Sequence, residues 1–392
     1  MELFDLDALT RDAAASGTPA IPLVQMLTAR AGVAARGFVH WGATSQDVID
    51  TALVLQMWDG LDLLERALRQ VAGRCAVMAD RHRRTLMAGR TLLQHAVPIT
   101  FGLKAARWLA LTTRLIVRLR EVRPRALVVQ FGGAAGTLAV LGQNGQRVMH
   151  ELARALGLGV PDLPWHAERD RVAEVAARLG IVAGAMAKVA TDIVLLSQTE
   201  VGEVSTHEPG AARSSAMPHK RNPAEATNAI AAARLALSVV PALMAGLVQE
   251  HERAAGAWQV EWDALPRLFG HTASAVHWVH HALAGMEIDA ARMQANLDAS
   301  CGLIMSEALM TALAPALGRD EAYRLVQHLA SQATTQRRPL ADVAAADARV
   351  RASLSIETMA RAFDLSGYLG STEVFIARAL EGYHALPAME TR

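Results

Sequence analysis

Apolar side chains recur every three or four residues through several long stretches of the chain, which is the spacing of one face of an α-helix. One such stripe runs from Val48 to Met78, and another runs from Val172 to Leu196. The second alternates steps of three and four without a break, a pattern typical of helices that pack on one another. An alanine-rich segment over 224–248 continues the helical pattern. The sequence therefore predicts an all-α protein built on a bundle of long helices.

Changes in this pattern divide the chain into three parts. Residues 1–47 hold short helices broken by glycine and proline, residues 48–285 hold the long-helix bundle, and residues 286–392 hold shorter helices with charged faces. A chain of 392 residues is long enough for two or three domains. A helix over 169–198 is too long for a small monomer to bury, so we expect a bundle that is shared between subunits.

Composition narrows the class of protein. Hydrophobic residues make up 52% of the chain but aromatic residues only 4%, which favours helix packed on helix over sheet. The formal charge of +1 gives no electrostatic reason to expect binding to nucleic acid or to an anionic membrane. The first residues lack a basic region followed by an apolar core, so we expect no signal peptide, and we expect no uninterrupted apolar run that spans a bilayer.

The two cysteines, Cys75 and Cys301, lie in helical patterns. We interpret them as buried thiols rather than as a disulfide or a metal site, which fits a reducing cytoplasm.

The segment His40–Asp47 is the first polar stretch before a long helix. Thr44 and Asp47 have the spacing of a capping box, so helix capping alone explains Thr44, Ser45 and Asp47 about as well as a binding role does. The same geometry leaves backbone N–H groups and hydroxyls at a helix N-terminus, where a carboxylate can bind.

Two further interruptions follow. The segment Gly89–Gly102 contains His95, and a lone histidine is more often structural than catalytic. The segment Gln130–Thr137 is rich in glycine, but it lacks the Gly-Lys-Ser/Thr of a phosphate loop. It is better interpreted as a turn between helices with close backbone approach.

The most informative stretch is Gly210–Pro223, which places two hydroxyls, an imidazole, two cations and an amide in nine residues. Its glycine and prolines predict a loop between helices. Lysine, serine and asparagine together suit the binding of an anion. A solvated basic turn is the simpler interpretation of Lys-Arg beside proline alone.

The string Ser-Ser-Ala-Met-Pro-His-Lys-Arg-Asn-Pro within this loop resembles the signature of the fumarase/aspartase superfamily. The resemblance implies that the loop closes over the substrate and that Ser214 or Ser215, as an alkoxide, exchanges the proton next to a carboxylate. It implies that Lys220 and Asn222 hold that carboxylate. Relatives carry glycine where this chain has Arg213, which changes the flexibility of the loop.

Other segments resemble further blocks of the superfamily. His40-Trp-Gly-Ala-Thr-Ser-Gln-Asp is similar to the first block, Gly-Arg-Thr-Leu-Leu-Gln-His-Ala-Val-Pro to the second, and Gln249-Glu-His-Glu-Arg to a segment after the signature. The resemblance makes one histidine and one serine pair candidates for the chemistry and the other residues candidates for substrate binding. The catalytic candidates are Ser214, Ser215 and His95, and the binding candidates are His40, Thr44, Ser45, Thr91, Gln94, Lys220, Asn222 and Arg253.

Two departures bear on the reaction. Relatives that expel an amine or hydroxide carry a histidine and a glutamate that form a proton relay, and here these positions are Leu92 and Thr227. Glu225 is near the second position but lies on a different helix face. The paired loss favours a reaction whose leaving group needs no proton. In reverse, a substrate carboxylate attacks a double bond and closes a lactone, and the enzyme stabilises and protonates the carbanion that develops.

The branch with this chemistry is the 3-carboxy-cis,cis-muconate cycloisomerase family of aromatic-compound catabolism, and segments along nearly the whole chain resemble it. The resemblance implies a polycarboxylate substrate, no metal, no organic cofactor, and a cytoplasmic homotetramer whose sites combine blocks from three subunits. Members of that family have several more helical turns before Pro19, so we expect a truncated first domain.

Two other functions stay open on the sequence. An elimination like that of adenylosuccinate lyase is the alternative reaction, although Leu92 and the lack of an evident phosphate-binding cluster disfavour it. An inactive helical scaffold is the second alternative. The intact signature string disfavours the scaffold, whereas Arg213 and the short first domain favour it.

Overall fold

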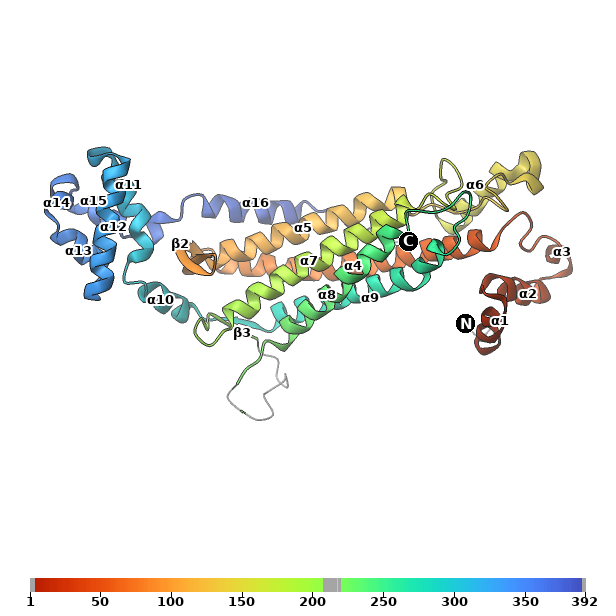
Figure 1. Ribbon diagram of the computed structural model, residues 1–392, viewed down its shortest axis with the longest axis horizontal. Coiled ribbons are helices and arrows are strands. Elements are labelled where there is room, and N and C mark those ends of the chain that lie inside the picture. The colour runs from red at the N-terminus through yellow and green to blue at the C-terminus, as the bar shows by residue number, and fades with distance from the viewer. Residues whose placement is uncertain (1–3, 207–216, 218–219, 390–392) are drawn as a thin grey trace. The chain divides into compact units, whose positions relative to one another are not determined.

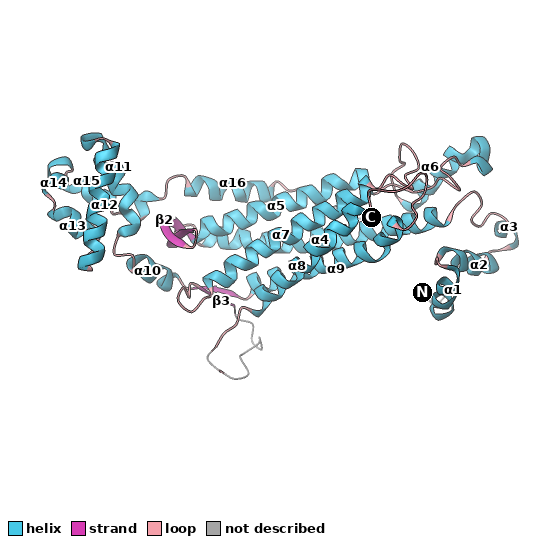
Figure 2. Ribbon diagram, in the orientation of Figure 1, coloured by secondary structure: helices cyan, strands magenta, loops and turns pink. Residues whose placement is uncertain are grey.

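The computed structural model describes residues 4–206, 217 and 220–389. Within them the chain forms sixteen α-helices, with four short β-strands in two separate two-stranded sheets. Helix predominates throughout (Figure 2). The predicted all-α class is therefore confirmed.

The helices follow the order of the predicted elements, and Figure 1 colours them along the chain. Three short helices come first, namely α1 (Leu6–Ser16), α2 (Ala20–Arg30) and α3 (Val33–Arg36). The long helices are α4 (Ser45–Arg81), α5 (Phe101–Ala126), α7 (Asp170–Leu196), α8 (Ala224–Ala245) and α9 (Ala257–Ala284), with the shorter α6 (Gly145–Leu156) after α5. The remaining helices are α10 (Ala290–Asp298), α11 (Ser306–Leu317), α12 (Arg319–Gln336), α13 (Leu340–Ala346), α14 (Ala348–Ser353), α15 (Ile356–Ala362) and α16 (Thr372–His384).

Helix α4 illustrates why these segments are helical. Its apolar stripe is buried along its length, including Leu61, Leu64, Leu68 and Val71, each no more than 1% exposed. Steps of three and four residues place these side chains on one face, which packs against the core while polar residues take the other faces. At 37 residues the helix rises about 55 Å.

The chain divides into two compact units, each assembled from three stretches. The first unit comprises residues 1–67, 115–184 and 231–275, and the second comprises residues 68–114, 185–230 and 276–392. The expected division into residues 1–47, 48–285 and 286–392 follows the sequence instead, and it stays a prediction.

Within the first unit, helices pack closely at glycine residues, which have no side chain to hold the helices apart. A Cβ atom on Gly60 of α4 would lie 2.7 Å from the Phe269 ring of α9, and one on Gly180 of α7 would lie 3.0 Å from Val240 of α8. Ion pairs add to this packing, because Arg120 of α5 lies 2.7 Å from Glu65 of α4.

Within the second unit, Trp108 of α5 donates a hydrogen bond from its indole Nε1 to Asp192 of α7 at 2.7 Å. The C-terminal helices have a core of their own, which includes Leu309, Leu313 and Leu325. The shorter helices predicted after residue 286 are therefore present and packed on one another.

The segment after α4 differs from the sequence prediction, which expected a polar interruption without strands. It forms an antiparallel hairpin of β1 (Leu86–Thr91) and β2 (Gln94–Thr100). Leu92 and Leu93 make the turn, and both have a left-handed backbone with φ of 51° and 64°. Two left-handed residues are the mark of a type I′ turn, which matches the twist of the two strands. A second, shorter pair joins β3 (Val204–Thr206) to β4 (Met286–Ile288).

We expected no apolar run that could span a bilayer, but two helices meet the length and composition that a membrane span requires. The expectation is wrong in that respect. Among the described residues, α7 and α8 are each long and apolar enough, with mean hydropathy of 1.8 and 1.6 over an 18-residue window, and the bent pair α10 and 303–317 adds a third candidate if it is counted as one. Half of the α7 window is buried inside the protein. The apolar character of α7 is thus used in part for packing between helices.

The prediction that both cysteines are buried is confirmed for one of the two. Cys75 is buried on α4, but Cys301 is exposed. Helix α10 ends at Asp298, and Cys301 lies in the turn that follows with φ of 47°. Its helical pattern was misleading because Gly302, also left-handed, reverses the chain at that point.

Candidate active site

Asp47, in the first turn of α4, organises the first polar block. Its carboxylate is 2% exposed and accepts four hydrogen bonds. The donors are the backbone N–H groups of Thr44 (3.0 Å), Gly132 (2.9 Å) and Gly133 (2.9 Å) and the Nε2 atom of His166 (2.7 Å). The bond from Thr44 is the glutamate side of a capping box, here made by aspartate, so the predicted capping geometry is present.

The glycine-rich segment surrounds this carboxylate because its glycines leave room. Gly133 has φ of +70°, and a Cβ atom on Gly132 would lie 2.7 Å from the His166 ring and 2.6 Å from Pro164. Successive N–H groups in such a turn form an anion-binding concavity. In this chain the anion is the side chain of Asp47.

Arg253 holds the opposite side of the same turn. Its Nη2 atom donates to the carbonyl oxygens of Ala134 at 3.0 Å and Gly133 at 3.4 Å. The first block, the glycine-rich turn and the segment of Arg253, which are far apart in the sequence, therefore meet within the first unit. Thr44 and Ser45 are partly exposed beside this turn, and His40 is partly exposed with φ of 60°.

A buried ion network supports this region. The Arg169 guanidinium, in a residue that is 2% exposed, lies 2.7 Å from Asp50 of α4 and also pairs with Glu261 of α9. Trp258 adds a hydrogen bond to Asp50 at 2.9 Å. Burial opposes the charge of Arg169, but its bonds to the two carboxylates hold its pKa above the usual value.

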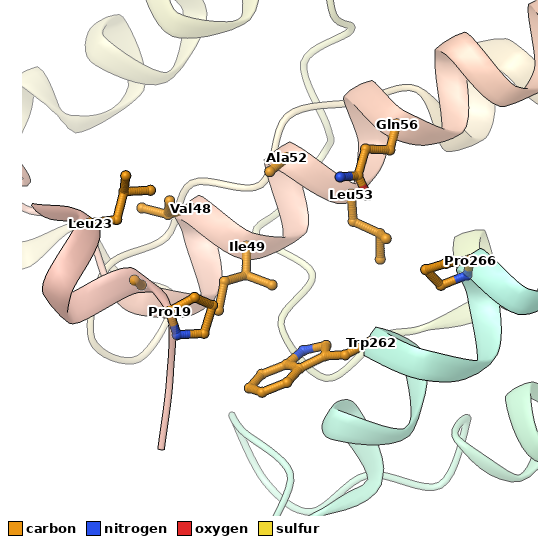
Figure 3. Close-up of a pocket in the computed structure, with 10 residues that line it drawn as sticks. Pro19, Leu23, Val48, Ile49, Ala52, Leu53, Gln56, Trp262 and Pro266 are labelled. Carbon is orange, nitrogen blue, oxygen red and sulfur yellow. The ribbon is translucent and has the colours of Figure 1, made fainter. Parts of the chain in front are cut away.

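Two pockets of the first unit lie close to the first block, and both are mainly apolar. One of about 430 Å³ is bounded by α2, the start of α4, α6 and Phe131, with His40, Asp47 and Gln130 among its few polar neighbours. The other, of about 280 Å³, lies between α2 and α4 on one side and Trp262 and Pro266 of α9 on the other (Figure 3). Apolar walls do not suit a polycarboxylate, so we assign the substrate to neither.

The second block lies in the second unit, at the turn of the hairpin. Thr91 pairs with Gln94 across the turn, and Thr91, Gln94 and His95 are all exposed. The adjacent Arg90 makes a two-pronged contact with the buried Glu203, at 2.9 and 2.6 Å. Asn296 of α10 donates to the same carboxylate at 2.8 Å.

The environment of His95 favours its neutral form. Partial desolvation and the neighbouring Arg90 guanidinium lower the pKa of His95 below its ordinary value of 6.5, while Glu203 acts in the opposite direction. The direction of this shift favours the neutral imidazole over the imidazolium.

The signature loop is described only at its end. Ser214 and Ser215 lie outside the described residues, as do Arg213 and His219. Lys220 and Asn222 are exposed directly before α8, and the Asn222 carbonyl accepts from the N–H of Ala224 at 2.9 Å. Strand β3, which leads toward the loop, follows Glu203 directly. Glu203 thus links the hairpin to the start of β3.

The structure groups the candidates by unit. His40, Thr44, Ser45 and Arg253 gather in the first, and Thr91, Gln94, His95, Lys220 and Asn222 belong to the second. Sequence reasoning missed His166 and Glu203, each of which ties distant segments together. The polar string Trp165-His166-Ala-Glu-Arg169 before the apolar stripe of α7 was the available signal.

Two protein-family models match the chain. The model described as Lyase matches residues 10–237, and the model described as Adenylosuccinate lyase C-terminus matches residues 302–379. Together they cover the long-helix part up to α8 and most of the C-terminal helices.

Comparisons with individual proteins point to the same family. The chain is 47% identical to a 3-carboxy-cis,cis-muconate cycloisomerase of Pseudomonas aeruginosa, over 98% of this chain and 85% of the relative, and 45% identical to one of Bradyrhizobium diazoefficiens, over 96% and 85%. It superposes on the crystal structure of 3-carboxy-cis,cis-muconate lactonizing enzyme from Pseudomonas putida with a TM-score of 0.90 at 43% identity, over 98% of this chain and 86% of that one. The chain therefore belongs to the fumarase/aspartase superfamily of lyases, as do the 3-carboxy-cis,cis-muconate cycloisomerases that it matches.

Proposed function

We propose that this protein interconverts 3-carboxy-cis,cis-muconate and a carboxymuconolactone. The observation that carries the proposal is 43–47% identity, over nearly the whole chain, to proteins named for that reaction or for the lactone it forms. The reaction class is an intramolecular lyase, placed in the catabolism of aromatic compounds.

The bonds that form and break lie within the substrate, and one proton from the enzyme, replaced from solvent, completes the reaction. One substrate carboxylate adds through oxygen to a carbon–carbon double bond, and the electron pair of that bond moves to the carbon next to another carboxylate. A proton delivered to that carbon completes the lactone. A carboxylate nucleophile needs no base, which is consistent with Leu92 and Thr227 at the positions where relatives carry a proton relay.

We assign the proton transfer to Ser214 or Ser215 of the signature loop. Lys220 and Asn222 would stabilise the developing charge, as a point charge and a directed donor. Thr44 and Ser45 at the start of α4 would bind a substrate carboxylate, with Arg253 adding positive charge. His40, Thr91, Gln94 and His95 complete the proposed lining of the site.

The proposal includes a cytoplasmic homotetramer with sites shared between subunits. Helix α8 supports an assembly, because only 28% of its apolar window is buried within the chain. Leu235 and Leu237 on that helix are 51% and 44% exposed. Exposed apolar helix surface of this extent is typical of subunit interfaces.

An elimination that releases fumarate is the second candidate. The match of residues 302–379 to the adenylosuccinate lyase C-terminus favours it. Leu92 disfavours it, because a poor leaving group needs a proton donor and the exposed leucine at the hairpin turn supplies none.

The serine pair provides the test of this mechanism. Replacing Ser214 and Ser215 together by alanine should lower kcat for 3-carboxy-cis,cis-muconate by roughly a hundredfold or more, the usual effect of losing an acid–base group. Ser16→Ala is the matched control, because Ser16 is exposed on α1 and its hydroxyl bonds the Asp12 carbonyl of its own helix. Turnover that survives the double replacement would show that another group moves the proton.

A further inference from the structure

In the part of the chain that the structure describes, Asp47 has four hydrogen-bond donors, of which His166 is the one side chain and the other three are backbone N–H groups. A carboxylate offers about four acceptor positions, so these donors fill it. His166 is 3% exposed and Asp47 is 2% exposed. A buried carboxylate that loses one donor keeps an unsatisfied lone pair and costs free energy.

His166 is tied to the first block at two points. Its ring bonds Asp47, and its backbone carbonyl accepts a hydrogen bond at 2.8 Å from the side chain of Gln46, the residue before Asp47 on α4. Its ring also fills the space beside Gly132. His166 therefore joins the start of α4 to the glycine turn, although 119 residues separate it from Asp47.

This arrangement decides which donors remain for a ligand. The N–H groups of Gly132 and Gly133, which would otherwise form an anion site, are bound to Asp47. The N–H of Thr44 is bound to it as well. The side-chain hydroxyls of Thr44 and Ser45 are thus left to bind a substrate carboxylate, at a position set by the Asp47 carboxylate.

We propose that His166 is a positioning residue for substrate binding: by saturating Asp47 it locks the glycine turn to the first turn of α4 and orients Thr44 and Ser45. The proposal rests on the proposed function, because it assigns those two residues to a substrate carboxylate. His166 itself does not touch the reacting atoms. Its removal should weaken binding and leave the chemical step almost intact.

Two replacements separate the hydrogen bond from the ring. His166→Gln keeps a donor at the place of Nε2, and His166→Leu removes it while keeping a buried side chain. His150→Leu is the matched control, because His150 is exposed on α6 and its ring bonds the Gln146 carbonyl of its own helix. Each variant is measured for KM and kcat with 3-carboxy-cis,cis-muconate, and for amide hydrogen exchange of peptides that cover residues 130–137.

We expect His166→Leu to raise KM roughly tenfold or more with kcat within about threefold, the signature of lost uniform binding. Exchange of the 130–137 amides should accelerate in the same variant. His166→Gln should restore both within about threefold, and His150→Leu should match the parent protein.

Several results would overturn the proposal. An unchanged KM in His166→Leu, with either fast or slow exchange, would mean that the turn does not serve binding. A collapse of kcat at unchanged KM in both His166 variants would make His166 part of the chemistry. If His166→Leu does not fold, His166→Asn decides, because its shorter side chain cannot reach Asp47 as Nε2 does and should show the same rise in KM. A parent protein without turnover would instead contradict the proposed function, which is a separate outcome.

Discussion

Arg169 and Glu203 are buried charged side chains, and each is held by more than one partner. Arg169 pairs with two carboxylates in the first unit, and Glu203 receives both prongs of Arg90 and an amide of Asn296 in the second. Burying such groups costs desolvation energy that pairing about offsets, so their main effect is on geometry rather than on stability. Both networks include neighbours of residues proposed to bind substrate, because Arg90 precedes Thr91 and Asp50 lies in α4 shortly after Ser45.

His95 should leave a mark on the pH dependence of turnover. Its pKa is lowered below 6.5 by partial desolvation and by Arg90, so protonation sets in only at more acidic pH. If the neutral imidazole is required, kcat/KM should be flat near pH 7 and fall on an acidic limb centred below 6.5.

A pH–rate profile of the parent protein beside His95→Gln tests this directly, because an amide does not titrate in this range. Loss of the limb in the variant would assign it to His95. A limb centred above 6.5, or one that persists unchanged in His95→Gln, would contradict the assignment.

Single residues were predictable from the sequence where their partners are local. Thr44 and Asp47 are three positions apart, and their capping contact follows from spacing alone. His166 could not be found that way, because its bond to Asp47 spans 119 positions and depends on how α4 and the glycine turn come together. Ser214 and Ser215 rest on the resemblance of the signature string and stay predictions.

At the scale of elements, the hairpin of β1 and β2 presents an unusual turn. Leu92 is 96% exposed and Leu93 is 71% exposed, and both adopt a left-handed backbone that costs roughly 1–2 kcal/mol per residue for a side chain with Cβ. Strain at an exposed turn is retained where the turn has a function, and this turn carries Thr91 and Gln94 on its flanks.

Replacing Leu92-Leu93 by Asn-Gly should therefore stabilise the protein by about 1 kcal/mol, because this pair is preferred in type I′ turns. Thermal denaturation measures the change. Leu163→Gly is the control: Leu163 is 71% exposed outside the left-handed region, so glycine there should be neutral or destabilising. A destabilised Asn-Gly variant would mean that the leucines make contacts that outweigh their strain.

The long helices could be predicted because apolar side chains recur at helical spacing over 20 residues or more. A stretch of that length cannot be mistaken for a β-strand. The hairpin was missed because its strands have six and seven residues and Leu92-Leu93 lacks the glycine or asparagine that signals such a turn. The left-handed backbone at Cys301 was missed for the same reason, since no local residue type required it.

At the scale of the whole molecule, the exposed apolar face of α8 is the surface that we propose for contact between copies of the chain. Leu237→Asp should place a charge on the exposed apolar face of that helix and shift the assembly to smaller species at micromolar concentration. Light scattering coupled to size-exclusion chromatography measures the mass. Ile356→Asp is the control, because Ile356 is 86% exposed on α15 and carries no proposed contact. An unchanged mass in Leu237→Asp would exclude this face from the interface.

Turnover of 3-carboxy-cis,cis-muconate by the unaltered protein is the direct test of the proposed reaction. Purified protein is added to 3-carboxy-cis,cis-muconate, and the ultraviolet absorbance of the conjugated diene is followed, with adenylosuccinate run in parallel. We expect rapid loss of the diene and no change in adenylosuccinate. Turnover of adenylosuccinate with a stable diene would contradict the proposed reaction, because it would show that Leu92 does not prevent an elimination.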